Sequence, residues 1–290
     1  MQIEIKDLVY TYSEKSKDLA VRALDGVSLT VNEGEFFGIV GHTGSGKTTF
    51  VQHLNGLIKL GKNNGSIVIG DFNLADKKCD FKALRSKVGM VFQYPEYQLF
   101  AETVKEDVAF GLKNFDKNVS EQEVEERVRE AIELVGLNYN RIKNKSPFEL
   151  SGGQKRRVAI AGVIVTRPEI LVLDEPAAGL DPKGKKEFLE LLHDLHKRFV
   201  KTVVFVSHDM NLVAEHCTRA AIFSHGKIHA EGTPKELFTK IDDLTCMGLD
   251  KPVTAMLESK LKEVGLSVDS DLTVDDFIEN FMKKYTEEVL

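Results

Sequence analysis

A glycine-rich loop between a short apolar run and a helical segment constrains this chain more than any other feature. Residues 35–41, EFFGIVG, predict a buried strand, and residues 48–57, TTFVQHLNGL, have the periodicity and the terminal Gly of a helix. Between them stands GHTGSGKT, residues 41–48, which fits the pattern G-x-x-x-x-G-K-[ST]. Strand, glycine-rich loop and helix in this order predict an α/β fold built around a phosphate-binding turn.

The residue types in this loop suit the phosphates of a nucleotide. Glycines let backbone N–H groups turn toward phosphate oxygens, Lys47 supplies a positive charge, and the Thr48 hydroxyl is a ligand for Mg²⁺. We therefore expect the nucleotide to be held by Gly41, His42, Thr43, Gly44, Ser45, Gly46, Lys47, Thr48 and Thr49.

A second apolar run, ILVLDE at 170–175, predicts a strand that is buried on both faces and ends in Asp174 and Glu175. Ligands of open α/β sheets gather beyond the carboxyl ends of the strands. We expect Asp174 to hold Mg²⁺ together with Thr48, and Glu175 to orient or deprotonate the water that attacks the γ-phosphate. The alternative is that Glu175 only caps the next turn.

Two further predicted strands end in polar residues at the same edge. KVGMVFQ ends in Gln93 and TVVFVSH ends in His208. The Gln93 amide would reach the metal or the water, and the His208 imidazole would donate a hydrogen bond to the γ-phosphate. The shared edge favours these roles over structural ones. Gln93, Glu175 and His208 are therefore the candidate catalytic residues, and Thr48, Gln93 and Asp174 are the candidate metal ligands.

A second glycine-rich turn, ELSGGQ at 149–154, lies far along the chain from the first. Ser151 is placed to cap a helix that runs toward Val165, so the N–H groups of that helix would face an anion. The candidate residues are Ser151, Gly152, Gly153 and Gln154. If residues 41–48 already enclose the nucleotide, a single chain has no evident use for a second phosphate-binding turn.

The rest of the pattern divides the chain into an N-terminal group of strands, a helical region at about 94–165, and a C-terminal helical extension. Residues 66–74 predict one more edge strand, and Ser120 with Glu123 predicts a capping box before an apolar stripe. Two amphipathic helices are expected after Pro252 and after Thr273. We place a domain at residues 1–245 and the extension at 246–290, which packs either on its own domain or on another subunit.

Composition narrows the class of protein. The net charge of −6 gives no bulk argument for a nucleic-acid partner. Cys79, Cys217 and Cys246 lack metal-binding or disulfide-framework spacing, which favours a reducing compartment. The start of the chain lacks the features of a secretory signal, and the longest apolar run, residues 158–165, is far shorter than a membrane span. We expect any link to a membrane to go through a partner.

Six motifs in order resemble those of the nucleotide-binding subunits of ATP-binding-cassette (ABC) transporters, over about residues 3–240. They are the Walker A loop at 41–49, the Q-loop at Gln93, the signature LSGGQ at 150–154, Walker B at 170–175, the D-loop AGLDP at 178–182 and the switch histidine His208. The resemblance implies an α/β P-loop NTPase of ABC type: a parallel-sheet core, an antiparallel β subdomain, a helical signature subdomain and a small helical extension.

The same resemblance implies ATP and Mg²⁺ as ligands. It gives Tyr12 the role of stacking on adenine, with Tyr10 as a weaker alternative. It also implies that Ser151, Gly152, Gly153 and Gln154 bind the γ-phosphate of an ATP held by the opposite subunit, so that two ATP molecules lie between two subunits. Ala177 and Leu112 depart from common family residues at positions that do not touch the phosphates in the family's scheme.

Within the family, FQYPEYQLFAETVKEDVAFG resembles the ATPase subunits of energy-coupling-factor (ECF) importers of vitamins or metal ions, most closely the second ATPase of the pair. This implies a peripheral protein at the cytoplasmic face of the cell membrane. Its partners would be a second ATPase, an integral membrane coupling subunit and a substrate-binding membrane subunit. YPEYQLF either receives the coupling subunit or packs on the helical region. The alternatives are another class of ABC transporter or a soluble, non-transport ABC ATPase.

Overall fold

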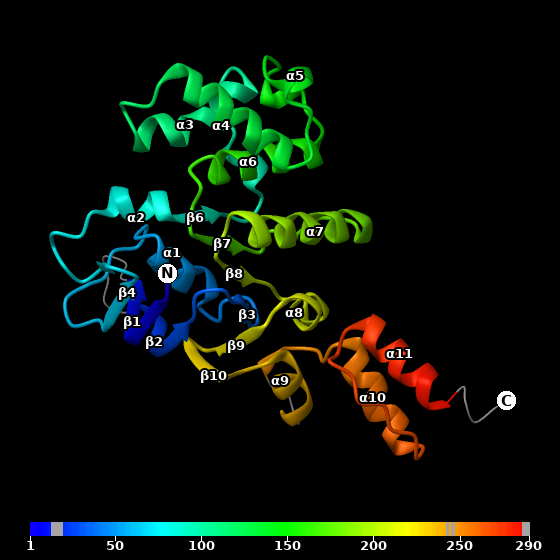
Figure 1. The fold of residues 1–290 in the computed structure, drawn as a ribbon. Helices are drawn as coiled ribbons and strands as arrows, with labels where there is room; N and C mark the ends of the chain where they lie inside the picture. The colour runs from blue at the N-terminus through cyan, green and yellow to red at the C-terminus, as the bar shows by residue number, and fades with distance from the viewer. Residues whose placement is uncertain (13–19, 242–243, 245–246, 286–290) are drawn as a thin grey trace.

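The computed structural model describes residues 1–12, 20–241, 244 and 247–285. Its strands form two sheets, one with the order β2-β1-β4-β5 and one with the order β10-β9-β3-β8-β7-β6 (Figure 1). The strands are β1 (Ile3–Tyr12), β2 (Val21–Val31), β3 (Phe36–Val40), β4 (Ser66–Ile69), β5 (Phe72–Asn73), β6 (Val88–Val91), β7 (Ile170–Asp174), β8 (Thr202–Val206), β9 (Arg219–Ser224) and β10 (Lys227–Gly232).

The six-stranded sheet is the core of the molecule. Neighbouring strands from β9 to β6 pair in parallel, and only β10 is antiparallel. Every residue of β3, β7 and β8 is buried, as expected for apolar strands covered on both faces. The predicted α/β fold with a parallel-sheet core is confirmed.

Helices cover this sheet and extend above it. They are α1 (Lys47–Leu54), α2 (Phe81–Lys87), η2 (Pro95–Gln98), α3 (Val104–Phe115), α4 (Glu121–Leu134), α5 (Tyr139–Ile142), η3 (Pro147–Glu149), α6 (Gly152–Ile164), α7 (Pro182–Arg198), α8 (Met210–His216), α9 (Pro234–Lys240), α10 (Val253–Glu263) and α11 (Val274–Tyr285). The segment from η2 to α6 joins β6 to β7 and forms a helical layer beyond the edge of the core sheet (Figure 1).

The start of α4 corrects one detail of the prediction. The Ser120 hydroxyl accepts a hydrogen bond from the Glu123 N–H, as predicted. The reciprocal half of a capping box is not formed, because the Glu123 carboxylate pairs with Arg127 one turn later at 2.8 Å. The predicted apolar stripe is buried at Val124, Val128, Ala131 and Val135.

The segment at 66–74 is two strands rather than one. β4 pairs with β1 on one side and with β5 on the other, so β5 forms the edge of that sheet. Gly70 has φ of 53° between the two strands, a left-handed conformation that suits a tight hairpin turn. The prediction of a single edge strand was therefore wrong.

The two C-terminal helices form where they were expected, but α10 buries a different face. Thr254 and Ala255 are buried, whereas the apolar side chains of Val253 and Leu257 lie at the surface, 49% and 41% exposed. α10 is anchored to α8 by a hydrogen bond from the Val253 N–H to Asn211 Oδ1 at 2.9 Å. The proposed domain boundary at 245/246 lies outside the described residues.

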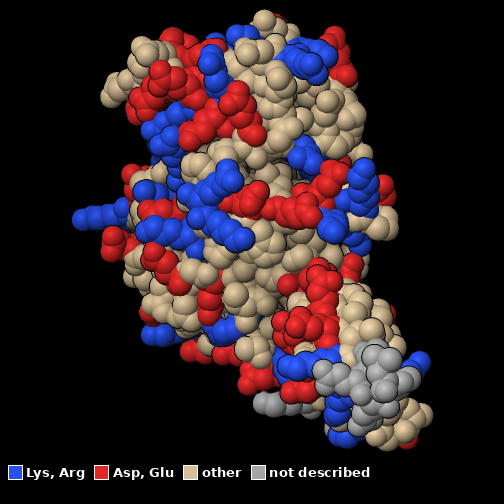
Figure 2. Space-filling view, turned by 45° about the vertical axis from the view of Figure 1, so that its right-hand side comes forward, with Lys and Arg blue, Asp and Glu red and all other residues tan. Residues whose placement is uncertain are grey.

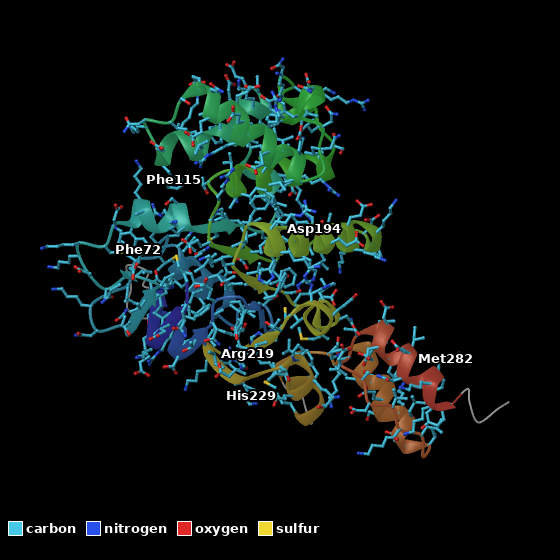
Figure 3. The ribbon with its side chains drawn as sticks, viewed as in Figure 1. Phe72, Phe115, Asp194, Arg219, His229 and Met282 are labelled. Carbon is cyan, nitrogen blue, oxygen red and sulfur yellow. The ribbon has the colours of Figure 1, made fainter. Side chains whose placement is uncertain are left out.

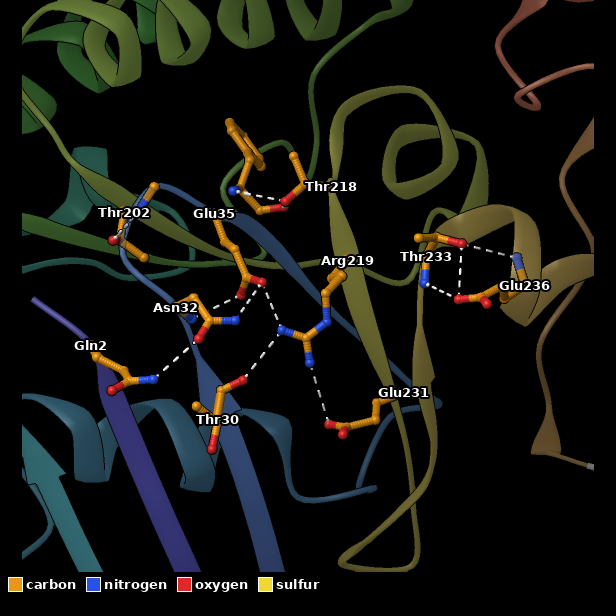
Figure 4. A network of polar contacts seen from close by, with 12 residues as sticks. Gln2, Thr30, Asn32, Glu35, Thr202, Thr218, Arg219, Glu231, Thr233 and Glu236 are labelled. Atoms are coloured by element: carbon orange, nitrogen blue, oxygen red, sulfur yellow. Dashed lines mark hydrogen bonds and ion pairs between the residues drawn. The ribbon is translucent and has the colours of Figure 1, made fainter.

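One polar network connects the two sheets (Figure 4). Arg219 Nη1 of β9 donates to Glu35 Oε1 at 2.7 Å and to the Thr30 carbonyl of β2 at 3.4 Å. Glu35 also accepts hydrogen bonds from the Asn32 N–H and side-chain amide. Burial alone would raise the pKa of Glu35, but the bonds from Asn32 and Arg219 prevail and lower it.

We predict that Glu35→Gln lowers the free energy of unfolding at pH 7 by about 1–3 kcal/mol, because a charged hydrogen-bonded acceptor is lost. A carboxyl whose pKa is lowered by folding stabilises the protein above its unfolded pKa. That contribution is lost as the pH falls through the folded pKa. Urea unfolding should therefore show the gap between the two proteins closing below about pH 4.

The matched control for this experiment is Glu4→Gln on β1. Among the described residues Glu4 pairs only with Lys6, at 3.9 Å on the surface, so its loss should change the free energy of unfolding by less than about 0.5 kcal/mol. A gap for Glu35→Gln that stays constant down to about pH 3 would show that its charge is not the stabilising feature.

Candidate functional site

The glycine-rich loop closes tightly between β3 and α1, and two of its glycines explain how. A Cβ at Gly41 would lie 2.4 Å from the Phe223 carbonyl oxygen, and a Cβ at Gly46 would lie 2.5 Å from the Ala23 carbonyl oxygen. Gly46 also has φ of 105°, a backbone conformation that residues with a side chain rarely adopt. Only glycine at these two positions lets the backbone approach its neighbours this closely.

Lys47 is the first residue of α1 and one of the few buried charged residues in the part of the chain that the structure describes. It is 7% exposed, and its Nζ donates to the carbonyl oxygens of Gly41 at 2.6 Å and of His42 at 3.0 Å. Burial lowers the pKa of Lys47, while the nearby carboxylates of Glu175 and Asp174 oppose that shift. The cation therefore lies inside the loop, beside the two acidic residues at the end of β7.

A cleft of about 430 Å³ opens beside the loop. Tyr12 lies at its rim, 44% exposed, with its hydroxyl 3.2 Å from Thr49 Oγ1. The cleft brings together most of the predicted nucleotide and catalytic residues, and it is lined by Tyr12, Val21, Arg22, Ala23, Thr43, Gly44, Gly46, Lys47, Thr48, Thr49, Gln93, Glu175 and His208. Gly41 and Ser45 belong to the same loop and are buried.

The Asp174 carboxylate fits a bound cation. It is 4% exposed, and its Oδ1 has no hydrogen-bond partner among the described residues. Burial raises the pKa of Asp174, against a hydrogen bond from Thr48 that lowers it. A buried carboxylate oxygen without a donor, beside a threonine hydroxyl, is an oxygen-ligand set that suits Mg²⁺.

Glu175 follows Asp174 and turns its carboxylate toward His208. Glu175 Oε2 lies 2.7 Å from His208 Nδ1, and the backbone of Glu175 has φ of 49°, a left-handed conformation unusual for a residue with a side chain. The carboxylate of Glu175 thus contacts an imidazole, and the next turn is closed by the Glu175 carbonyl, which accepts the Ala178 N–H.

Strand register explains why these residues meet. Asp174 lies opposite Val206 of β8, and Leu173 lies opposite Val91 of β6. Gln93 and His208 each come two residues after these partners, so they extend past the same edge. Both side chains are exposed and line the nucleotide cleft as well as a second cleft, of about 310 Å³, beside the turn after Glu175.

The signature residues lie apart from this cleft. Ser151 caps α6 with a complete capping box: its hydroxyl accepts from the Gln154 N–H, and Gln154 Oε1 accepts from the Ser151 N–H. Ser151, Gly152 and Gly153 are exposed, and a Cβ at either glycine would meet nothing within 4 Å. Residues 151–154 therefore do not line the nucleotide cleft of their own chain.

Sequence reasoning missed one charged residue of the cleft. Arg22 of β2 lines the cleft opposite the loop and pairs with Asp25 at 2.5 Å. A single arginine in an alternating strand is too common a pattern to indicate a site. Only the antiparallel pairing of β1 with β2, which places Arg22 opposite Thr11, brings it next to Tyr12.

Comparison with known proteins identifies the family. The family model "ABC transporter" matches residues 24–178. The energy-coupling factor transporter ATP-binding protein EcfA2 of Clostridium tetani is 46% identical over 272 residues, covering 94% of this chain and 93% of the relative. The chain belongs to the ABC transporter family. EcfA2 of Clostridioides difficile is also 46% identical, over 98% of this chain and 97% of the relative.

Solved structures of ABC cassettes share the fold. CbiO1 from Clostridium perfringens, part of the ABC transporter complex cbiONQ, has a TM-score of 0.73 at 34% identity and covers 91% of this chain and 96% of its own. A dimeric ATP-binding cassette in a post-hydrolysis state, bound to ADP and Pi, has a TM-score of 0.70 at 32% identity, over 80% and 98% of the two chains. The ABC fold is thereby confirmed.

As an ABC transporter ATPase, the chain binds ATP and couples its hydrolysis to transport. Within the part of the chain that the structure covers, no helix combines the length and the apolar character that crossing a membrane requires.

We predict that Gly46→Ala weakens ATP binding by at least about 10-fold. The strained φ and the clash with the Ala23 carbonyl cost about 1–3 kcal/mol, and they would distort the phosphate loop itself. Titration of the purified chain with a fluorescent ATP analogue measures this. Gly34→Ala is the matched control: Gly34 has φ of 94° with nothing within 4 Å, so it should lose stability without losing affinity. Equal affinities for all three proteins would contradict the prediction.

Proposed function

We propose that this chain is the ATP-hydrolysing subunit of an ECF-type importer of vitamins or metal ions, driven by ATP-dependent closure of a pair of ATPases. The observation that carries the proposal is the single cleft shared by Tyr12, Lys47, Glu175, Gln93 and His208, in a chain that matches ECF ATP-binding proteins over nearly its whole length.

In this proposal ATP binds with adenine on Tyr12 and its phosphates in the loop at 41–49. Backbone N–H groups and the Lys47 ammonium face the β- and γ-phosphates. Mg²⁺, when bound, neutralises phosphate charge. Thr48, Asp174 and Gln93 would hold it, and the unpartnered Oδ1 of Asp174 supports that assignment.

Hydrolysis requires a water to lose a proton as it attacks the γ-phosphate. Glu175 would accept that proton, since its carboxylate lies at the edge of the cleft and at the end of β7. The contact between Glu175 Oε2 and His208 Nδ1 holds the carboxylate in place and leaves His208 Nε2 to face the γ-phosphate. Gln93, on the neighbouring strand end, would orient the water or the metal.

We predict that Glu175→Gln retains ATP binding but loses turnover by about 10²- to 10⁴-fold, because a neutral amide does not accept the proton. Steady-state phosphate release and nucleotide titration measure the two quantities. Glu169→Gln is the matched control, at the opposite end of β7, where Glu169 pairs with Lys87 and Lys201 and faces no cleft residue. Turnover of Glu175→Gln equal to that of the control would remove Glu175 from catalysis.

The signature turn supports pairing with a second ATPase. Its exposed glycines and capped helix lie outside the nucleotide cleft of the same chain, so a phosphate bound there would come from another subunit. We propose a heterodimer, with Ser151, Gly152, Gly153 and Gln154 on the partner's ATP. The related cassette bound to ADP and Pi is described as dimeric, which supports this arrangement.

The C-terminal helices contact their own domain, through the bond from Val253 to Asn211 of α8, and their exposed apolar residues support an additional contact with a subunit. These residues include Val253, Leu257 and Ile278, with 49%, 41% and 53% exposure. We propose that the residue range 246–290 is an extension distinct from the ATPase domain at 1–245, and that these residues face the second ATPase.

The segment after Gln93 supports a membrane partner. Pro95 and Leu99 are buried on the helical region, but Tyr97 is 83% and Phe100 61% exposed, and Phe100 packs edge-on against Phe110. Apolar aromatic groups left at the surface are typical of docking sites. Packing on the helical region thus accounts for only part of YPEYQLF, and we propose that the rest receives an integral membrane coupling subunit.

A groove nearby supports the same site. A cleft of about 190 Å³ lies between the core and the helical region, lined among others by Arg85, Met90, Phe115 and Val163. Phe115 stands at the end of α3 that faces α2 (Figure 3). Through this docking the chain would lie at the cytoplasmic face of the cell membrane, with a substrate-binding membrane subunit beyond the coupling subunit.

The visible charge distribution gives no reason to propose nucleic acid instead. Acidic side chains gather over the helical region, with Lys and Arg between them (Figure 2). Glutamate-rich α4 is part of this region. A surface of this kind would repel a phosphate backbone, so we propose protein partners only.

We predict that affinity purification of this chain, expressed with the neighbouring genes, recovers a different ATPase and integral membrane proteins. Tyr97→Asp with Phe100→Asp should release the membrane proteins and keep the second ATPase, because a charge on that surface disrupts only the membrane contact. Lys59→Asp introduces an aspartate at another exposed position and is the control, which should keep all partners. Recovery of a homodimer with an exporter membrane domain would favour another ABC class, and recovery of no membrane protein would favour a soluble ABC ATPase.

A further inference from the structure

Arg156 of α6 is the most deeply buried arginine that the structure describes, and the nucleotide cleft does not include it. Its side chain is 7% exposed, although it lies only two residues after Gln154 of the signature. A guanidinium keeps its charge at any pH at which the protein is folded, so burial at this depth requires partners that hold it in a fixed place.

Those partners come from two other segments of the chain. Arg156 Nε donates to Glu96 Oε2 at 3.2 Å, and Nη2 donates to Glu96 Oε1 at 3.1 Å, which makes a bidentate ion pair with η2. Nη2 also donates to the Ala178 carbonyl at 3.1 Å. One planar group therefore joins the signature helix, the segment after Gln93 and the turn after Glu175.

Both of these segments are attached directly to candidate catalytic residues. Glu96 lies three residues after Gln93, beyond Tyr94, whose φ of 55° marks a sharp backbone turn. Ala178 donates its N–H to the Glu175 carbonyl at 3.1 Å. The residues of these two turns line one cleft together with His208. A displacement of either turn thus reaches Arg156 through a single hydrogen bond or ion pair.

The ion pair between Arg156 and Glu96 fixes the orientation of the two side chains as well as holding them together. Two parallel N–H···O bonds fix the angle between guanidinium and carboxylate, unlike the contact of a point charge such as an ammonium. α6 is a continuous helix from Gly152 to Ile164, so holding Arg156 holds the orientation of the helix N-terminus at Ser151. The contacts of Arg156, one helical turn further along α6, therefore set the orientation of the exposed LSGGQ segment.

We propose that Arg156 is a positioning residue that couples the turns after Gln93 and Glu175 of this chain to the orientation of LSGGQ, and so to the ATP of the second subunit. The inference rests on the proposed function, in which LSGGQ completes the partner's ATP site. It assigns a route by which the γ-phosphate of one site, and the membrane subunit docked near Tyr97, affect the other site.

The neighbouring arginine provides a matched control. Arg157 lies on the same helix but points elsewhere: it donates to the Val135 carbonyl at 2.9 Å and pairs with Glu187 at 3.1 Å. Neither contact reaches a cleft residue. Arg157→Lys and Arg156→Lys make the same chemical change. Only Arg156→Lys removes a guanidinium that bonds to both the turn after Gln93 and the turn after Glu175.

The test measures kcat and KM of the ATPase in the assembled complex, together with the ATP affinity of the full isolated chain. Arg156→Lys and Glu96→Gln should each lower kcat by about 10- to 100-fold, because a helix misplaced by about 1 Å spoils the partner's site. ATP affinity of the isolated chain should stay within about twofold, and Arg157→Lys should match the unchanged protein in both quantities.

Thermal unfolding shows which variants are folded at the assay temperature, and turnover is compared per folded protein. Since Glu96→Gln keeps the shape of the side chain, it preserves the test if Arg156→Lys proves unstable. The inference is overturned if both folded variants keep the kcat of Arg157→Lys. It is also overturned if ATP affinity of the isolated chain falls in parallel with kcat, since that result indicates a general structural role.

Gly152→Asp separates failure of the inference from failure of the proposed function. Its Cβ meets nothing within 4 Å in this chain, so the variant should fold, while its carboxylate would repel a phosphate bound by LSGGQ. If Gly152→Asp leaves ATP-driven closure intact by cross-linking, the shared site itself is wrong. If Gly152→Asp abolishes closure and the Arg156 and Glu96 variants keep the kcat of Arg157→Lys, only the role of Arg156 fails.

Discussion

The parallel register of β6, β7, β8 and β3 is the constraint on which the rest of the structure depends. These strands have no exposed residue, and their pairing places Asp174 opposite Val206. Because parallel strands all point the same way, the residues that follow them emerge at one edge. The phosphate loop follows β3 at that edge. The residues proposed for nucleotide binding, metal binding and water activation therefore meet at one edge because the strands share one register.

Backbone strain marks the two places where this edge is most constrained. Glu175 and Tyr94 adopt left-handed conformations although neither is glycine, with φ of 49° and 55°. Such a conformation costs about 1–3 kcal/mol and persists only where surrounding contacts hold it. Here the contacts are specific: His208 holds the Glu175 carboxylate, and Arg156 holds Glu96, two residues after Tyr94. The strain and the polar contacts that oppose it belong to the same turns.

The sequence predicted the sheet edge well because its signals are local. Apolar strands that end in Asp174, Gln93 and His208 are visible without a structure, as is the loop at 41–48. The turn at Gly70–Asp71 that divides residues 66–74 was also visible in the sequence and was missed. Contacts between distant segments left no such signal. Nothing in the spacing indicates that Arg156 meets Glu96, or that α10 buries Thr254 and not Leu257.

The glycines of the signature turn are explained by neither local strain nor packing. Gly152 and Gly153 have no left-handed backbone, and a Cβ at either would meet no atom of this chain within 4 Å. Glycine loses more backbone entropy on folding than alanine does, so within the protomer these two residues bring no gain in stability. Lys47, Gly41 and Gly46 of the first loop contrast with them, since each has a partner or a close neighbour within the chain. The physical reason for an open, side-chain-free helix N-terminus therefore lies in a group that approaches from outside. A phosphate carried by a second subunit satisfies that requirement, and the buried fork of Arg156 determines the angle at which the helix meets it.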